Sequence, residues 1–145
     1  MTPSDTPHAR FRILIADDDP ADAIRLEGML RDAGYKQVRA TTDLREVADF
    51  YAKWPFDLLL IDMAGDVDGY GVIVKLSANM ADMTGGDADA PIILALLEDS
   101  RRESQERALV AGARDFIVRP FDRPEVVSRV RNMLDLQGAR RITAG

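Results

Sequence analysis

The sequence lacks cysteine entirely, and this absence removes several kinds of chemistry from consideration. Without a thiol, the chain can form neither a disulfide nor a thiolate nucleophile or metal ligand. Its single histidine, His8, lies in an N-terminal stretch with two prolines, and we interpret it as a tail residue without a ligand role. A chain without disulfides is compatible with a reducing compartment, and we expect a cytoplasmic protein.

Long apolar runs and an excess of positive charge are also absent. No segment approaches the roughly 18 consecutive apolar residues of a membrane span, and the N-terminus lacks the apolar run of a signal peptide. The net charge of −6 argues against non-specific binding to DNA or to an anionic membrane. There is also no helix-turn-helix pattern and no basic face, so we expect this domain to contact neither nucleic acid nor membrane.

The composition that remains is typical of one globular domain. The 145 residues are 46% hydrophobic and 30% charged, which is sufficient for a hydrophobic core in a single domain. We divide the chain into a disordered leader at residues 1–10, a domain at 11–137, and a flexible basic tail or linker at 138–145.

Five apolar runs alternate with five segments of helical periodicity. Runs of this kind predict strands that are buried on both faces, as parallel sheets require. The expected strands are residues 12–16, 36–40, 56–62, 91–97 and 114–118. The alternation predicts an α/β fold with a doubly wound, five-stranded parallel sheet and five helices, and we expect the strand order 2-1-3-4-5.

Short polar signals predict where the helices begin and end. Asp19 is expected to cap the first helix, which Gly34 ends. Thr42 is expected to cap the second helix, and Ser100 with Glu103 forms a capping box before the fourth. Each of these caps would satisfy backbone N–H groups that the first turn of a helix leaves unpaired.

Carboxylates follow two of the predicted strands. Asp17 and Asp18 come directly after strand 12–16, and Asp62 is the last residue of strand 56–62. In open α/β sheets, ligands bind beyond the carboxyl ends of the strands. Neighbouring carboxylates repel one another unless a cation joins them or some are protonated. A hard divalent ion with oxygen ligands resolves this conflict, and Mg²⁺ is the ion we expect.

Three known kinds of site fit this acidic sequence poorly. The triplet Asp17-Asp18-Asp19 resembles the Asp-x-Asp of haloacid-dehalogenase phosphatases, but Ala21 replaces their later Thr or Val. An EF-hand loop beginning at Ala64 would lack its first ligand and would have Lys75 at its twelfth position. Binding of FMN would need a Ser/Thr-rich phosphate loop where the chain has the acidic triplet, which would repel a phosphate.

Five motifs occur in an order and spacing that match one protein family. They are Ile13-Leu14-Ile15-Ala16-Asp17-Asp18-Asp19-Pro20, Asp62 after its apolar strand, Asp68-Gly69-Tyr70, Ala111-Gly112-Ala113-Arg114-Asp115-Phe116 and Arg119-Pro120-Phe121. Together they resemble the receiver domain of response regulators in two-component signalling, over roughly residues 11 to 137. The resemblance implies the flavodoxin-like fold of receivers.

The same resemblance implies a role for each acidic residue. Asp62 matches the aspartate that a histidine kinase phosphorylates in this family. Asp18 matches a direct Mg²⁺ ligand, Asp17 matches a ligand that usually acts through water, and the backbone carbonyl of Ala64 matches the third protein ligand. We therefore expect a phosphoryl-accepting signalling domain with Mg²⁺ as its cofactor, and no enzymatic activity beyond slow self-dephosphorylation.

Several positions depart from the family pattern, so the chain resembles an atypical receiver. Leu96 stands where the family has Thr or Ser, so no hydroxyl can bond the phosphoryl group there. Leu97 replaces a small residue, and Arg119 replaces the lysine that pairs with a phosphoryl oxygen, keeping its charge but not its shape. Phe116 occupies the position of the switch aromatic and cannot hydrogen-bond. The resemblance also suggests a cis peptide bond between Arg119 and Pro120.

Two functions remain open on this basis. One is a switch that accepts a phosphoryl group on Asp62; the other is a phosphorylation-independent interaction module that keeps only the receiver fold. The switch implies a histidine kinase or phosphotransfer protein as donor, and a downstream effector protein or fused output domain as target. A homodimer through the fourth helix, fifth strand and fifth helix is a further expectation. The sequence leaves open which kinase and output these are, and whether the domain stands alone.

Overall fold

The fold is a five-stranded sheet between two layers of helices, seen in a computed structural model that describes residues 9–84 and 90–144. Most of the expected leader lies outside the described residues. The elements in chain order are β1 (Arg12–Ala16), α1 (Pro20–Asp32), β2 (Gln37–Thr41), the 3₁₀ helix η2 (Leu44–Glu46), α2 (Val47–Lys53), β3 (Leu58–Asp62), α3 (Gly69–Thr84), β4 (Ile92–Leu97), α4 (Arg102–Ala111), β5 (Asp115–Val118) and α5 (Arg123–Ala144).

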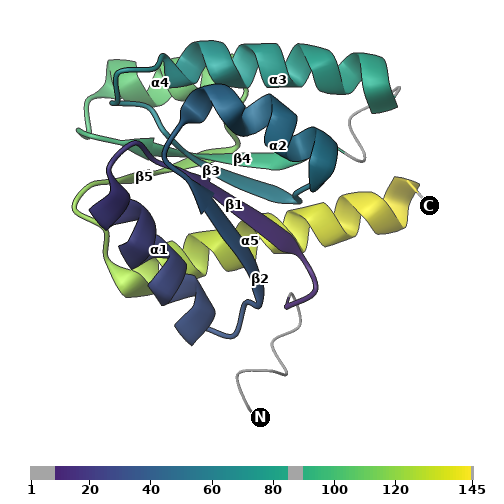
Figure 1. The fold of residues 1–145 in the computed structure, drawn as a ribbon, viewed down its shortest axis with the longest axis horizontal. Helices are drawn as coiled ribbons and strands as arrows, with labels where there is room; N and C mark the ends of the chain where they lie inside the picture. The colour runs from purple at the N-terminus through teal and green to yellow at the C-terminus, as the bar shows by residue number, and fades with distance from the viewer. Residues whose placement is uncertain (1–8, 85–89, 145) are drawn as a thin grey trace.

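The sheet is entirely parallel and has the order β2-β1-β3-β4-β5, which confirms the predicted fold class. Helices α1 and α5 cover one face of the sheet, and α2, α3 and α4 cover the other (Figure 1). Because β1 lies between β2 and β3, the C-terminal ends of β1 and β3 are direct neighbours, with Ala16 opposite Ile61. This register brings together the two chain segments that carry the predicted acidic residues.

The central strands are buried on both faces, as the apolar runs predicted. All five residues of β3 and all six of β4 are buried. Alternate side chains of each strand enter different cores: Leu58 and Leu60 pack with α1 and α5, whereas Leu59 and Ile61 pack on the opposite side. In the part of the chain that the structure describes, no helix combines the length and apolarity needed to cross a membrane.

Two of the expected helix caps are wrong, and in both cases a nearby aspartate makes the bonds instead. The Asp43 carboxylate, not Thr42, accepts the backbone N–H of Arg45 and caps η2. Before α4, Asp99 accepts the backbone N–H of Arg101 and the hydroxyl of Ser104, so Ser100 forms no capping box. A carboxylate is the stronger acceptor because the bond is charge-assisted.

Other predicted helix ends are confirmed. Asp19 caps α1, because its side chain accepts the backbone N–H of Ala21 at 3.0 Å. Gly34 and Gly112, which follow α1 and α4, have φ angles of 105° and 130°. Residues with a Cβ rarely adopt this left-handed region, so glycine suits both helix ends.

Helix α5 continues to Ala144, through the residues expected to form a flexible tail or linker. At the predicted end of the domain, Gln137 is fully buried and donates a hydrogen bond to the carbonyl of Ala90 at 3.0 Å. The next residue, Gly138, lies beside the ring of Phe11, where a Cβ would make only an ordinary van der Waals contact at 3.9 Å. These contacts hold α5 against the domain. The glycine and basic residues of segment 138–145 gave no sign of a continuing helix.

The burial of the central strand predicts a large effect of truncating it. Leu60 is fully buried, so Leu60→Ala should lower the free energy of unfolding by about 2–5 kcal/mol, through lost transfer energy and a residual cavity. Val110 is 87% exposed, so Val110→Ala serves as the control and should change it by less than about 0.5 kcal/mol. Urea denaturation followed by circular dichroism measures both. Equal effects would contradict the assignment of Leu60 to the core.

Candidate functional site

The predicted carboxylates converge at the C-terminal edge of the sheet. Oxygen atoms of Asp17, Asp18 and Asp62 all lie within 4.8 Å of one another. Asp17 is fully buried, Asp62 is 2% exposed, and Asp18 faces solvent. Two buried carboxylates and one accessible carboxylate therefore lie close enough to bind the same ion, and each would bind it through an oxygen atom.

Backbone N–H groups fix the orientation of each carboxylate. Asp17 accepts the N–H of Asp19 at 3.0 Å, and Asp62 accepts that of Ala64 at 2.9 Å. Asp18 accepts the N–H of Asp66 at 3.2 Å, across the loop that follows β3. The preceding Gly65 is necessary for this approach, because a Cβ at that position would overlap the Asp18 carboxylate.

Arg119 supplies the positive charge in the site. Its Nη2 donates to Asp17 Oδ2 at 2.8 Å and its Nε to Asp22 Oδ2 at 3.0 Å. Its Nη1 lies 3.3 Å from Asp62 Oδ1 and 3.7 Å from Glu98 Oε2. Nη1 is buried and makes no hydrogen bond within the described part of the chain. One guanidinium therefore interacts with four carboxylates.

Sequence reasoning identified Arg119 but missed Asp22 and Glu98. Asp22 lies in the first turn of α1, three residues after the cap Asp19, and Glu98 lies directly after β4. The position of Glu98 after a buried strand is the same signal that found Asp62. Asp22 had no such signal, because a carboxylate in a first helical turn usually reflects only the helix dipole.

Burial and mutual repulsion disturb the acid–base behaviour of the site. The pKa of Asp17 is raised from 3.8 to about 6, first by burial and then by the charge of Asp62, against the opposing effects of the Asp19 N–H and Arg119. Burial also raises the pKa of Asp62, with Asp18 adding to the effect. For Arg119, burial works toward a lower pKa, but the bond to Asp22 and the charges of Asp62 and Asp17 raise it overall. The arginine thus compensates the carboxylates incompletely.

The remaining predicted residues occupy the surroundings of the site. Leu96 is opposite Asp62 in the β3–β4 register, and its side chain is fully buried in the core beneath α1 and α5. Leu97 is buried on the other face, where Phe116 packs partly exposed. The peptide bond between Arg119 and Pro120 is cis, as predicted. No hydroxyl reaches the site from β4, in agreement with the sequence.

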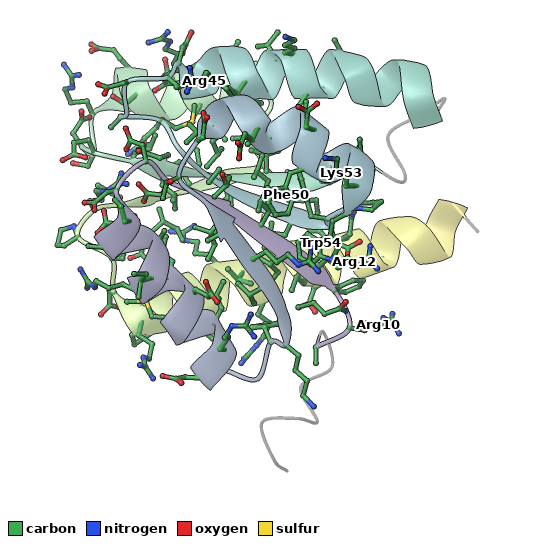
Figure 2. All side chains as sticks on the ribbon, viewed as in Figure 1. Arg10, Arg12, Arg45, Phe50, Lys53 and Trp54 are labelled. Carbon is green, nitrogen blue, oxygen red and sulfur yellow. The ribbon has the colours of Figure 1, made fainter. Side chains whose placement is uncertain are left out.

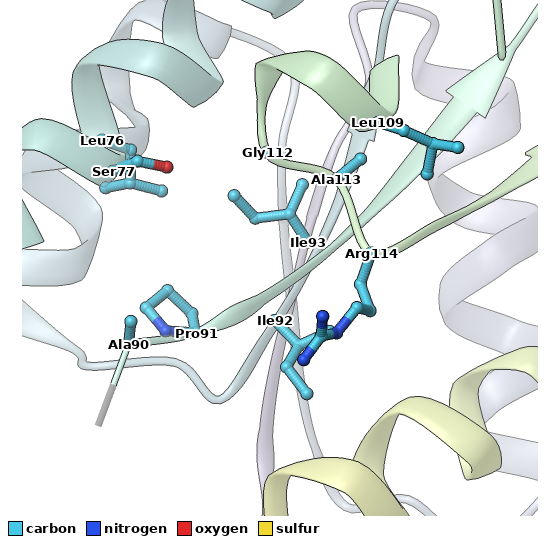
Figure 3. A pocket seen from close by; sticks show the side chains of 10 residues that line it. All are labelled: Leu76, Ser77, Ala90, Pro91, Ile92, Ile93, Leu109, Gly112, Ala113 and Arg114. Carbon is cyan, nitrogen blue, oxygen red and sulfur yellow. The ribbon is translucent and has the colours of Figure 1, made fainter. Parts of the chain in front are cut away.

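A small cavity of about 230 Å³ opens at the carboxylates. Its lining consists of Asp18, Asp19, Asp22, Asp62, Ala64, Glu98 and Arg119. A larger cavity of about 490 Å³ lies between α3, α4 and the beginning of β4 (Figure 3). Most of its lining residues have apolar side chains and none is a carboxylate, with Ser77 and Arg114 as its polar side chains. Of the two cavities, only the small one brings carboxylates and an arginine together, the groups that could carry out chemistry.

A third cavity, of about 330 Å³, lies beside Trp54 at the end of α2 (Figure 2). The guanidinium carbons of Arg39 and Arg12 lie 4.4 and 5.6 Å from the centre of the Trp54 ring. Arg12 is the first residue of β1, so Trp54 is at the opposite end of the sheet from the acidic cavity. Its fluorescence is therefore a poor probe of events at Asp62.

A parallel sheet of this order, with an acidic cavity at its carboxyl edge and a basic residue after its fifth strand, is the architecture of a receiver. The sequence matches the response regulator receiver domain family over residues 13–131, and the chain belongs to this family. A solved response regulator from Chloroflexus aurantiacus J-10-fl is 31% identical, has a TM-score of 0.75, and is matched over 86% of this chain and 98% of its own.

Two curated relatives are longer proteins. The DNA-binding dual master transcriptional regulator RpaA of Synechocystis sp. is 32% identical over 85% of this chain and 48% of its own length. The cell cycle transcriptional regulator CtrA of Caulobacter vibrioides is 29% identical over 83% of this chain and 48% of its own. The chain thus spans about half the length of the curated relatives it matches.

The raised pKa of Asp17 predicts an unusual pH dependence of stability. The folded protein binds the Asp17 proton more tightly than the unfolded chain does, so the ionised form costs stability above about pH 6, and this cost disappears toward pH 4. Without metal, the free energy of unfolding of Asp17→Asn should therefore rise relative to wild type by about 2–3 kcal/mol from pH 4 to pH 7.

Urea denaturation at several pH values, with a chelator present, measures this difference. The matched control is Asp49→Asn, because Asp49 is an exposed carboxylate on α2 outside the acidic cavity. Its difference from wild type should stay nearly constant over the same pH range. A constant difference for Asp17→Asn as well would contradict the raised pKa.

Proposed function

We propose that this domain accepts a phosphoryl group on Asp62 and that the modification changes its interactions with other proteins. The observation that carries the proposal is the approach of Asp17, Asp18 and Asp62 within 4.8 Å, with the Arg119 guanidinium beside them. Family membership supports it, because receivers act in two-component signalling. Acidic and basic groups together make a site that can receive a phosphoryl group and compensate its charge.

The phosphoryl donor we propose is a phosphohistidine on a histidine kinase or a phosphotransfer protein. An oxygen of the ionised Asp62 attacks phosphorus and forms the new O–P bond, while the P–N bond breaks and its electron pair returns to the imidazole. Arg119 stabilises the negative charge of the transferring oxygens, and its guanidinium is bonded to Asp17 and Asp22. The product is an acyl phosphate on Asp62, and we propose no enzymatic turnover beyond its slow hydrolysis.

Mg²⁺ is the cofactor we propose for this transfer. The side chains of Asp17, Asp18 and Asp62 and the carbonyl of Ala64 would hold it, and they fit because all of these donors are oxygens. When bound, the ion acts as an electrophile that neutralises the carboxylates and the phosphoryl oxygens. Asp18, the exposed member of the cluster, is the ligand that solvent can reach directly.

We propose that the consequences of phosphorylation reach a downstream effector protein or an output domain in a longer chain. A surface formed by α4, β5 and α5 is our candidate for these contacts and for a homodimer. It exposes Leu109 and Val110, at 45% and 87%. Some of its charges already have partners within the domain: Arg107 stacks on Tyr70 at 3.8 Å, and Arg129 pairs with Asp115 at 2.8 Å.

Phosphorylation is tested by incubating the protein with acetyl phosphate and Mg²⁺ and measuring its mass. We expect a gain of one phosphoryl group in wild type and none in Asp62→Asn, because the amide cannot attack phosphorus. Asp66→Asn is the control, since Asp66 is exposed in the loop after β3 and contributes only its backbone to the site. An unmodified wild type would instead favour the phosphorylation-independent interaction module.

Metal binding is tested by titrating Mg²⁺ while recording amide chemical shifts. We expect shifts at residues 17–19 and 62–64 with millimolar affinity, because Mg²⁺ retains several of its waters in such sites. Asp18→Asn should weaken binding by about tenfold or more, whereas Asp66→Asn should change it far less. Trp54 fluorescence should stay constant, since Trp54 packs against the beginning of β1. Absence of shifts near these residues would exclude the proposed metal site.

The absence of a hydroxyl at Leu96 predicts a weak response of α4 to phosphorylation. A ligand shifts a conformational equilibrium only through contacts that differ between the two states, and Leu96 lacks one hydrogen bond worth about 1–3 kcal/mol. We expect little change in hydrogen exchange over residues 95–122 when beryllofluoride binds at Asp62. Replacing Leu96 with Thr and Leu97 with Ala should increase it. Strong protection across α4 in wild type would refute this decoupling.

A further inference from the structure

Asp22 is a carboxylate of the acidic cavity that is absent from the set of predicted metal ligands and phosphoryl acceptors. It lies in the first turn of α1, and its side chain is 19% exposed. Its Oδ2 accepts a hydrogen bond from Arg119 Nε at 3.0 Å, and the two residues are 97 positions apart in the chain. This contact ties the start of α1 to the end of β5 across the cavity.

The bond to Asp22 determines how the Arg119 guanidinium is presented to Asp62. A guanidinium is planar, so two bonds to groups on different elements fix the direction of its third nitrogen. Nε bonds to Asp22 on α1, and Nη2 bonds to Asp17 after β1. Nη1 remains, buried and without a hydrogen bond to the described residues, 3.3 Å from Asp62 Oδ1. Nη1 is therefore the guanidinium nitrogen nearest the proposed phosphoryl acceptor, paired with Asp62 by charge but making no hydrogen bond to it.

We propose that Asp22 is a positioning residue for phosphoryl recognition, because it anchors Arg119 Nε and so reserves Nη1 for an oxygen of the phosphoryl group on Asp62. This inference deepens the proposed function and depends on it. Glu98 is less suited to this positioning role, because its carboxylate is 3.7 Å from Nη1 and its side chain is 66% exposed, so solvent screens the pair. Asp22 sits on a helix whose start is fixed by the Asp19 cap.

A positioning role and a purely electrostatic role of Asp22 predict opposite effects of its removal on the binding of an anion. If Asp22 were only one more negative charge in the cavity, its removal would favour the binding of an anion. If Asp22 positions Arg119, its removal frees the guanidinium, and the anion is bound more weakly. Asp19→Asn reports the charge effect alone, because Asp19 lines the same cavity and Asn caps a helix as well as Asp does.

The first measurement examines the anchor in the free protein, without metal or phosphate analogue. A hydrogen-bonded Arg119 Hε should exchange slowly with water and give a resolved ¹⁵N–¹H resonance. We expect this signal in wild type and Asp19→Asn, its loss in Asp22→Ala, and its partial return in Asp22→Glu, which restores the carboxylate. Unchanged exchange in Asp22→Ala would overturn the proposal, whether or not Asp62 accepts a phosphoryl group.

The second measurement compares the affinity for beryllofluoride at saturating Mg²⁺, followed by amide shifts. We expect Asp22→Ala to bind about tenfold more weakly, as a lost charge-assisted bond predicts, with Asp22→Glu recovering part of the loss. Asp19→Asn should bind as wild type or slightly more tightly. Equal or tighter binding by Asp22→Ala would overturn the positioning role. If wild type bound no beryllofluoride, the proposed function would fail, and Hε exchange alone would then judge whether Asp22 anchors the arginine.

Discussion

The ion pair between Arg119 and the buried carboxylates is the interaction on which the acidic cavity depends. Asp17 and Asp62 are almost completely excluded from water, and isolated charges in such a position would cost several kcal/mol each. The guanidinium compensates part of this cost, at 2.8 Å from Asp17 and 3.3 Å from Asp62. The raised pKa values of both carboxyls show that the compensation is incomplete. The uncompensated negative charge favours the binding of a proton or of a second cation at these carboxylates.

The sheet makes this arrangement possible because its interior holds the carboxylates in place. Asp17 continues β1 and Asp62 ends β3, and both strands are buried among large apolar side chains on two faces. Moving either carboxylate toward water would require moving a strand that carries much of the core. The burial of these apolar side chains thus offsets the repulsion between the Asp17 and Asp62 carboxylates. Strand register, rather than loop flexibility, sets their distance.

The sequence predicted the parts of this structure that depend on local pattern. Apolar runs indicated all five strands, and a carboxylate directly after such a run indicated Asp17, Asp18 and Asp62. It could not predict contacts between distant segments, such as the Asp22–Arg119 bond or the bond from Gln137 on α5 to the carbonyl of Ala90. Competing caps such as Asp43 were equally uncertain, because neighbouring polar residues can satisfy the same N–H groups.

With Leu96 on β4 and Arg119 after β5, the proposed phosphoryl recognition would depend on the residue after β5 rather than on a hydroxyl of β4. A hydroxyl on β4 would transmit the presence of a phosphoryl group to the loop before α4, but Leu96 is committed to the core and has no polar atom in its side chain. Arg119 follows β5 and is already bound to α1 through Asp22. A phosphoryl group on Asp62 that binds Nη1 while Nε stays on Asp22 would therefore act first on the connection between α1 and the segment joining β5 to α5. Helix α4 buries only Ala108 among its ten residues, so few of its side chains connect it to the core that carries the site.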